Sequence, residues 1–119
     1  MSSTRRQFYR ILPSRFPTVT DFLSFEALGR EPRTPLTPEA EERWRGISVF
    51  DTFENATAHV GRSAFLGRYA AVMEIGPEQQ VVAKRTGGTR GHWTLWGSAD
   101  ELLSCVTAII DISTEQEGT

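Results

Sequence analysis

The chain has 119 residues, of which 39% are hydrophobic and 10% aromatic, enough for one domain with its own core. Its 13 basic and 15 acidic residues give a formal net charge of -2, which argues against a nucleic-acid binder driven by overall charge. No apolar run approaches the ~20 residues that cross a bilayer, and no apolar signal segment follows Arg5 and Arg6. We therefore expect a cytoplasmic protein with no membrane partner.

Arginine dominates the basic residues, since Lys84 is the lysine and the other twelve are arginine. The planar guanidinium matches carboxylate and phosphate oxygens, so this bias suits a site for phosphorylated ligands. A base-composition bias of the source genome is the more common explanation of such a composition.

The first half of the chain predicts, in order, a strand over 7–12, a helix over 21–28, a proline-rich connector over 30–38, a helix from Thr37 to about 45, and a strand over 47–50. In the first helix Phe22, Phe25 and Leu28 recur at helical spacing, and Gly29 ends the pattern. Thr37 before a proline is typical of a helix start.

The second half predicts a helix from a capping box at Asp51, a strand over 68–75 in a hairpin with 79–84, a strand over 92–96, a helix over 98–104 and a strand over 105–112. Residues 1–6 are expected to be disordered, and residues 113–119 to form a flexible tail. Strands and helices without a repeating βα unit indicate a single α+β domain over residues 7–112.

Three familiar kinds of site find little support. The glycine-rich loop over 87–91 could hold a phosphate, but it leads into a strand and lacks a helix N-terminus. His59 and His92 are isolated and have no partners at metal-ligand spacing, so no metal is expected. Cys105 lies in the apolar run 102–112, which favours a buried thiol over a nucleophile.

Three polar residues on predicted strands are harder to dismiss. Arg10 interrupts an apolar strand, where a buried charge without a partner is unfavourable. Ser48 points away from Ile47 and Val49 on its strand. Alternation places His92, Thr94 and Trp96 on one face of a third strand, and Trp93 and Leu95 on the other. We expect the first face to be shared with Arg10, so that a cation, a hydroxyl and an imidazole meet in one cleft.

Four short motifs carry a resemblance to a known fold: Phe8-Tyr9-Arg10, the segment 46–52, Gly67-Arg68-Tyr69 and the segment 92–97. In this order they resemble the ADP-ribosyltransferase-like fold, and more narrowly small bacterial RES-domain-like proteins and related uncharacterised families. The resemblance spans residues 7–112 and implies a mixed β-sheet core with short flanking helices.

The resemblance implies roles for individual residues. Arg10 would hold NAD and Ser48 would support the nicotinamide ribose, with His92 beside them as the third candidate catalytic residue. Arg10, Thr94 and Trp96 form the predicted cofactor-binding set. The family places an acidic residue near a later strand, but residues 92–96 contain none, and the nearest acids, Asp100 and Glu101, belong to a predicted capping box.

The expected function is therefore that of a small ADP-ribosyltransferase-like protein that binds NAD or a related nucleotide. It would be a toxin or effector acting as an NAD-dependent ADP-ribosyltransferase or NAD glycohydrolase, or a relative that only binds the nucleotide. The alternative is a non-catalytic protein-interaction module, such as an immunity or antitoxin-like partner, that uses exposed aromatics such as Trp44 and Trp96.

Overall fold

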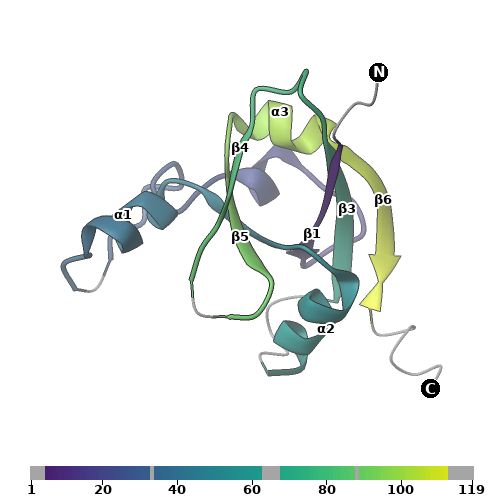
Figure 1. Cartoon of the computed structure of the whole chain (residues 1–119), viewed down its shortest axis with the longest axis horizontal. Helices are drawn as coiled ribbons and strands as arrows, with labels where there is room; N and C mark the ends of the chain where they lie inside the picture. The colour runs from purple at the N-terminus through teal and green to yellow at the C-terminus, as the bar shows by residue number, and fades with distance from the viewer. Residues whose placement is uncertain (1–4, 33, 63–67, 88, 113–119) are drawn as a thin grey trace.

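In the computed structural model, which describes residues 5–32, 34–62, 68–87 and 89–112, one six-stranded sheet organises the chain (Figure 1). The strand order is β4-β5-β2-β1-β3-β6, and the pairings between neighbouring strands are antiparallel. The elements are β1 (Arg6–Leu12), η1 (Val19–Phe22), α1 (Pro38–Trp44), β2 (Ile47–Phe50), α2 (Phe53–Arg62), β3 (Tyr69–Ile75), β4 (Val82–Arg85), β5 (His92–Trp96), α3 (Ala99–Ser104) and β6 (Val106–Asp111). The chain is thus a single α+β domain, as the sequence predicts.

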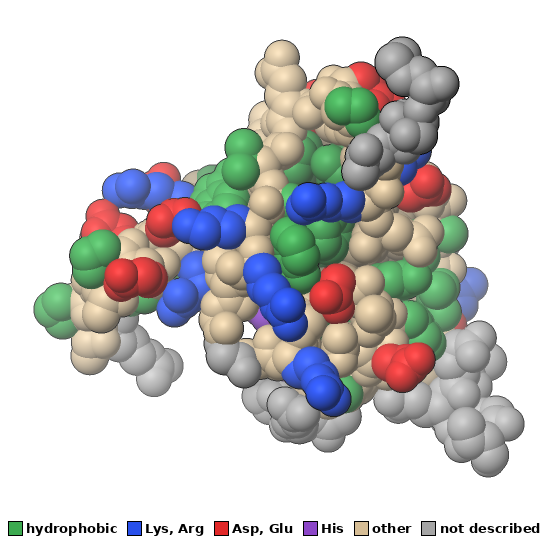
Figure 2. Space-filling model, viewed as in Figure 1, with side chains coloured by type: hydrophobic (Ala, Val, Ile, Leu, Met, Phe, Trp, Pro, Cys, Tyr) green, Lys and Arg blue, Asp and Glu red, His purple; other side chains and the backbone are tan. Residues whose placement is uncertain are grey.

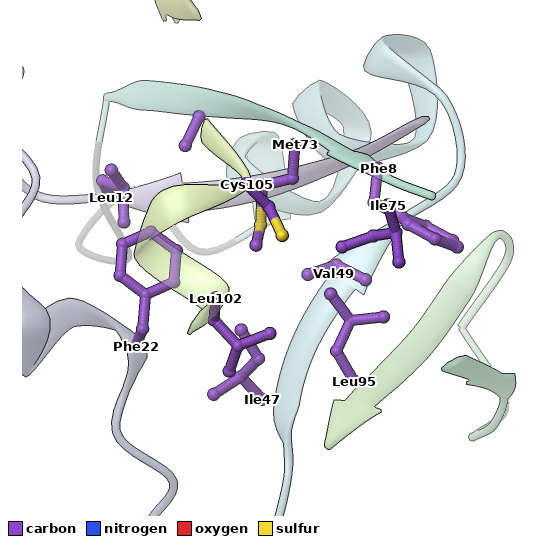
Figure 3. Close-up of a cluster of buried hydrophobic side chains, with 11 residues drawn as sticks. Phe8, Leu12, Phe22, Ile47, Val49, Met73, Ile75, Leu95, Leu102 and Cys105 are labelled. Atoms are coloured by element: carbon purple, nitrogen blue, oxygen red, sulfur yellow. The ribbon is translucent and has the colours of Figure 1, made fainter. Parts of the chain in front are cut away.

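The main core lies between one face of the sheet and the short helices α3 and η1 (Figure 3). Phe8 and Leu12 reach it from β1, while Leu102 enters from α3 and Phe22 from η1; each is at most 2% exposed. Cys105 is buried in the same cluster, which confirms the expectation drawn from its apolar neighbours. Burying side chains of this size supplies most of the drive to fold.

Helix α2 covers the opposite face and packs over β1 and β2. Ala56 and Val60 are buried and Phe53 is half-buried, so one apolar stripe of the helix faces the sheet. Val60 joins Ala70 and Ile112 in a second, smaller core cluster. The sheet therefore lies between α2 on one side and α3 with η1 on the other.

Two predictions about the sheet are wrong. Residues 79–84 do not form a hairpin with β3, because β1 and β6 occupy the two sides of β3, and β4 pairs with β5 instead. The sheet is antiparallel throughout its described pairings, whereas the resemblance implied a mixed sheet. The local sequence pattern predicts where strands lie but not which strands pair. Pairing depends on how the apolar faces of the whole chain pack together.

The helix predicted over residues 21–28 is also wrong. The chain forms the short 3-10 helix η1 and then a turn that ends at Gly29, whose φ is +76°. Of the three apolar residues at helical spacing only Phe22 is buried; Phe25 and Leu28 are 46% and 39% exposed. Because Phe25 and Leu28 stay outside the core, a helix here would lack the buried apolar face that stabilises short helices.

The first and last strands begin and end within one residue of the predicted positions. β1 begins at Arg6, one residue earlier than predicted, and the predictions for residues 1–4 and 113–119 lie outside the described residues. Within the described part, none of the helices has the length and apolar character needed to cross a membrane.

Candidate functional site

Arg10 is the centre of the candidate site. Strand alternation puts its Cβ on the same face as Phe8 and Leu12. In the sheet Arg10 pairs with Ala71 of β3. Its guanidinium donates from Nη1 to the Ser48 carbonyl of β2 at 2.8 Å, and from Nε and Nη2 to the Asp21 carbonyl of η1 at 3.1 and 2.9 Å. Arg10 thus connects three elements through backbone oxygens.

The charge of Arg10 is poorly compensated. Within the described part of the chain no carboxylate lies at ion-pair distance from it, and the carboxylate of Asp21 acts only at longer range. Desolvation lowers the pKa of Arg10 to about 10, and the Asp21 charge opposes this shift. The side chain therefore stays cationic at neutral pH in a desolvated position, where an anion would stabilise it.

A cavity of about 340 Å³ opens beside Arg10. It lies where β1 and β2 diverge, since their described register contains only the pair Tyr9 and Phe50. Polar groups and apolar side chains both line it: Arg10, Thr20, Asp21, Ser48 and His59 among the polar residues, and Ile11, Leu12, Pro13, Leu23, Phe25, Leu28 and Phe50 among the others. This mixture of an apolar wall and a few converging polar groups is typical of small-molecule sites.

Ser48 lies on the cavity wall and has an exposed side chain. Its carbonyl oxygen anchors Arg10, whereas its hydroxyl has no hydrogen bond to the described residues. The serine therefore has two separate roles: the backbone holds the cation, and the side chain is available to a ligand.

His92 lies elsewhere. It is not among the residues that line the cavity, and it pairs with Phe50, on the face opposite that of the Arg10 Cβ. Its Nδ1 lies 3.0 Å from the Thr86 carbonyl and 3.2 Å from the Thr86 hydroxyl. Burial lowers the pKa of His92, although the bond to the Thr86 carbonyl opposes that shift. The expectation that Arg10 and His92 share a face is wrong, because β1 and β5 present them to opposite sides of the sheet.

Thr94 and Trp96, predicted to bind the cofactor, also lie outside the cavity. Thr94 is 1% exposed, and its hydroxyl lies 2.6 Å from that of Thr86. Trp96 is half-buried and donates its indole N–H to the Glu42 carbonyl at 2.9 Å. Gly46 packs against both residues so closely that a Cβ there would lie 2.8 Å from the Leu95 carbonyl. These side chains serve the fold.

His59 is the cavity residue that sequence reasoning missed. It lies on α2, and its ring packs on Phe50 at 4.9 Å between centroids. Its position three residues after the buried Ala56 places it beside the apolar stripe of the helix. That spacing predicts a side chain near the sheet, but only the tertiary structure shows that α2 covers the point where β1 and β2 diverge.

Acidic groups near the cavity are already engaged. The Asp21 carboxylate accepts from the Thr18 backbone at 2.9 Å and lies 3.3 Å from its hydroxyl. Asp51 does not cap α2 as predicted; Thr52 accepts from the Asn55 backbone, and Asp51 accepts from the Asn55 amide and the Trp93 indole. Nowhere in the described ranges do three His, Cys, Asp or Glu side chains form a group that could hold a metal ion.

No protein-family model, curated protein or solved structure matches the chain. The cavity itself combines a desolvated cation, a serine hydroxyl and an imidazole on an apolar wall.

Proposed function

We propose that this chain binds a phosphorylated nucleotide, NAD or a fragment of it, in the cavity beside Arg10, with an ADP-ribosyltransferase-like fold. One observation carries the proposal: Arg10 from the first strand and Ser48 from the second line the same cavity. These are the two residues to which the resemblance gives the dinucleotide and the nicotinamide ribose.

The donors of Arg10 support a phosphate ligand. A guanidinium has five N–H groups, and three of them donate to the carbonyls of Asp21 and Ser48. The remaining donors, on Nη1 and Nη2, have no hydrogen-bond partner among the described residues. A phosphate would accept from them and would also balance the charge.

The size of the cavity supports part of a dinucleotide better than all of it. At about 340 Å³ it lies near the lower end of the ~300–1,000 Å³ typical of ligand pockets. A nicotinamide ring could rest on the apolar wall, with its ribose at Ser48 and its phosphate at Arg10. Nicotinamide mononucleotide is therefore the fragment that we expect to fit most completely.

Binding is better supported than turnover. Transfer or hydrolysis at the nicotinamide ribose needs stabilisation of a positively charged transition state, which a free carboxylate would provide. β5 has no acid, and the Asp21 carboxylate is engaged by Thr18. We propose nucleotide binding as the activity, and keep NAD glycohydrolase or ADP-ribosyltransferase activity as a separate question for assay.

Calorimetry with NAD, nicotinamide mononucleotide and ADP-ribose tests the proposal. We expect Arg10→Lys to weaken binding by about 1.5–3 kcal/mol, the range for a hydrogen bond to a charged group, because an ammonium cannot keep the fork of donors. Ser48→Ala is the matched variant that leaves the Arg10 anchor intact, since the anchor uses the Ser48 carbonyl. The absence of heat with all three ligands would overturn the proposal and favour the interaction module.

A further inference from the structure

A second surface of the protein combines an aromatic ring with several cations. Trp93 of β5 lies directly opposite Arg85 of β4, so the two side chains share a face. The Arg6 guanidinium lies 5.3 Å from the centroid of the Trp93 ring. Arg90 precedes Gly91, whose carbonyl accepts from the Asp51 backbone, and Asp51 in turn accepts from the Trp93 indole. We refer to Arg6, Arg85, Arg90 and Trp93 as the Trp93 patch.

The cations of this patch differ from others in the chain. Elsewhere Arg5 pairs with Glu78, Arg45 pairs with Glu26 and Glu41, and Lys84 lies 3.7 Å from Glu42. Arg6, Arg85 and Arg90 are exposed, and across the described residues none of them forms an ion pair with a carboxylate. Figure 2 shows Lys and Arg side chains gathered over the part of the molecule where β4 and β5 lie. The chain is acidic overall, yet it leaves this surface positive.

The indole of Trp93 is half-buried and already contacts other side chains. Phe8 packs against it at 5.3 Å between centroids, and Arg6 lies over the ring. Single-stranded nucleic acids bind largely by stacking bases on open aromatic faces along a positive groove. Because Phe8 and Arg6 already contact this ring, and the chain carries a formal charge of -2, base stacking and overall charge both favour nucleic acid little here.

We infer that the Trp93 patch docks an acidic segment of a protein partner. Carboxylates accept paired hydrogen bonds from guanidinium groups, and three unpaired arginines from different segments match a short run of Asp or Glu. Arginine is also among the residues most often found at the energetic centre of protein interfaces. None of the patch residues lines the Arg10 cavity, so this surface is independent of the nucleotide site.

Fluorescence polarisation with a labelled decaglutamate peptide tests this inference on the whole chain. We expect measurable binding at low salt, weakened at least about tenfold in the double variant Arg85→Glu/Arg90→Glu, with the Arg85→Gln/Arg90→Gln pair in between. The matched control is Arg15→Glu/Arg30→Glu, which makes the same change in net charge at exposed arginines over other rings, those of Tyr69 and Phe25. Thermal melts verify that each variant is folded.

Three results would overturn the inference. The wild-type chain could fail to bind the peptide, or the control pair could lose as much affinity as the patch pair, which would mean that only overall charge matters. An oligothymidylate of equal length could also bind more tightly than the peptide and depend on the same arginines. That result would assign the patch to nucleic acid.

Discussion

Two groups of polar residues on the strands of this sheet differ in what their side chains contact. Around Arg10 and Ser48, where β1 and β2 diverge, polar groups line a cavity. Around His92 and Thr94, in the continuous sheet of β2, β5 and β4, polar groups are half-buried or buried and bond to Thr86. Where strands pair along their whole length, a buried polar side chain needs a hydrogen-bond partner within the protein. Where two strands separate, a polar group can keep donors or acceptors available to a ligand.

Trp93 lies next to His92 on β5, and its removal should have the largest effect on stability. We expect Trp93→Ala to destabilise the fold by about 3 kcal/mol, since it removes a half-buried ring that packs on Phe8 and bonds to Asp51. Chemical denaturation measures the loss. His92→Ala is the comparison variant, and an equal loss there would make His92 a core residue rather than a partner of Thr86.

A smaller effect is expected at Gly46, which lies between the two groups of polar residues. Gly46→Ala should destabilise the fold by roughly 1–3 kcal/mol, because its Cβ would overlap the Thr94 side chain and lie 2.8 Å from the Leu95 carbonyl. Gly29→Ala is not a suitable control, since its positive φ adds strain of its own. A melting temperature unchanged by Gly46→Ala would contradict the close packing of Gly46 against β5.

A still smaller loss of stability is expected when the hydrogen bond between the Thr86 and Thr94 hydroxyls is removed. Thr94→Val keeps the shape of the side chain but removes its bond to Thr86, so we expect a loss of about 1 kcal/mol and no change in nucleotide affinity. Denaturation and calorimetry on the same variant measure both quantities. If Thr94→Val abolished nucleotide binding without changing stability, Thr94 would have to contact the nucleotide.

The pH dependence of stability tests the burial of His92. Its pKa lies below the ordinary 6.5 in the folded chain, so the unfolded state binds more protons and stability rises with pH. The contribution of His92 is complete above about pH 6.5 and is lost as the pH falls from there towards the folded pKa. Melts between pH 5.5 and 8 should show a shallower slope for His92→Asn; an identical slope would contradict the buried, neutral imidazole.

The smallest effect on stability is expected at the cavity. Ser48→Ala should change stability by less than about 0.5 kcal/mol, because the hydroxyl has no described partner and the side chain is exposed. Nucleotide affinity should fall by about 1 kcal/mol, roughly fivefold. A large loss of stability would instead place the hydroxyl in the fold.

The sequence predicted the strands and the starts of α1 and α3 well, because strand alternation and the capping residues Thr37 and Ser98 are local signals. It also predicted the strand positions of Arg10 and Ser48. It could not predict that β4 pairs with β5, because pairing depends on which apolar faces meet across the whole chain.

The same limit explains the errors at the site. Alternation correctly put His92 and Thr94 on one face, but the face of Arg10 relative to them depends on the register of β1 against β2. His59 has no metal-ligand partner at a suitable spacing in the sequence, so the sequence does not point to it. Its place at the cavity depends on the path of α2 over the sheet, which no local pattern contains.

The most direct test of the central claim is a nuclear magnetic resonance titration with nicotinamide mononucleotide that follows backbone amides and arginine Nε–H groups. We predict that the largest shift changes occur at Arg10, Ser48 and His59, with little change at Thr94 and Trp96. Changes centred on Thr94 and Trp96, or none at saturating ligand, would contradict the assignment of the nucleotide to the cavity between β1 and β2.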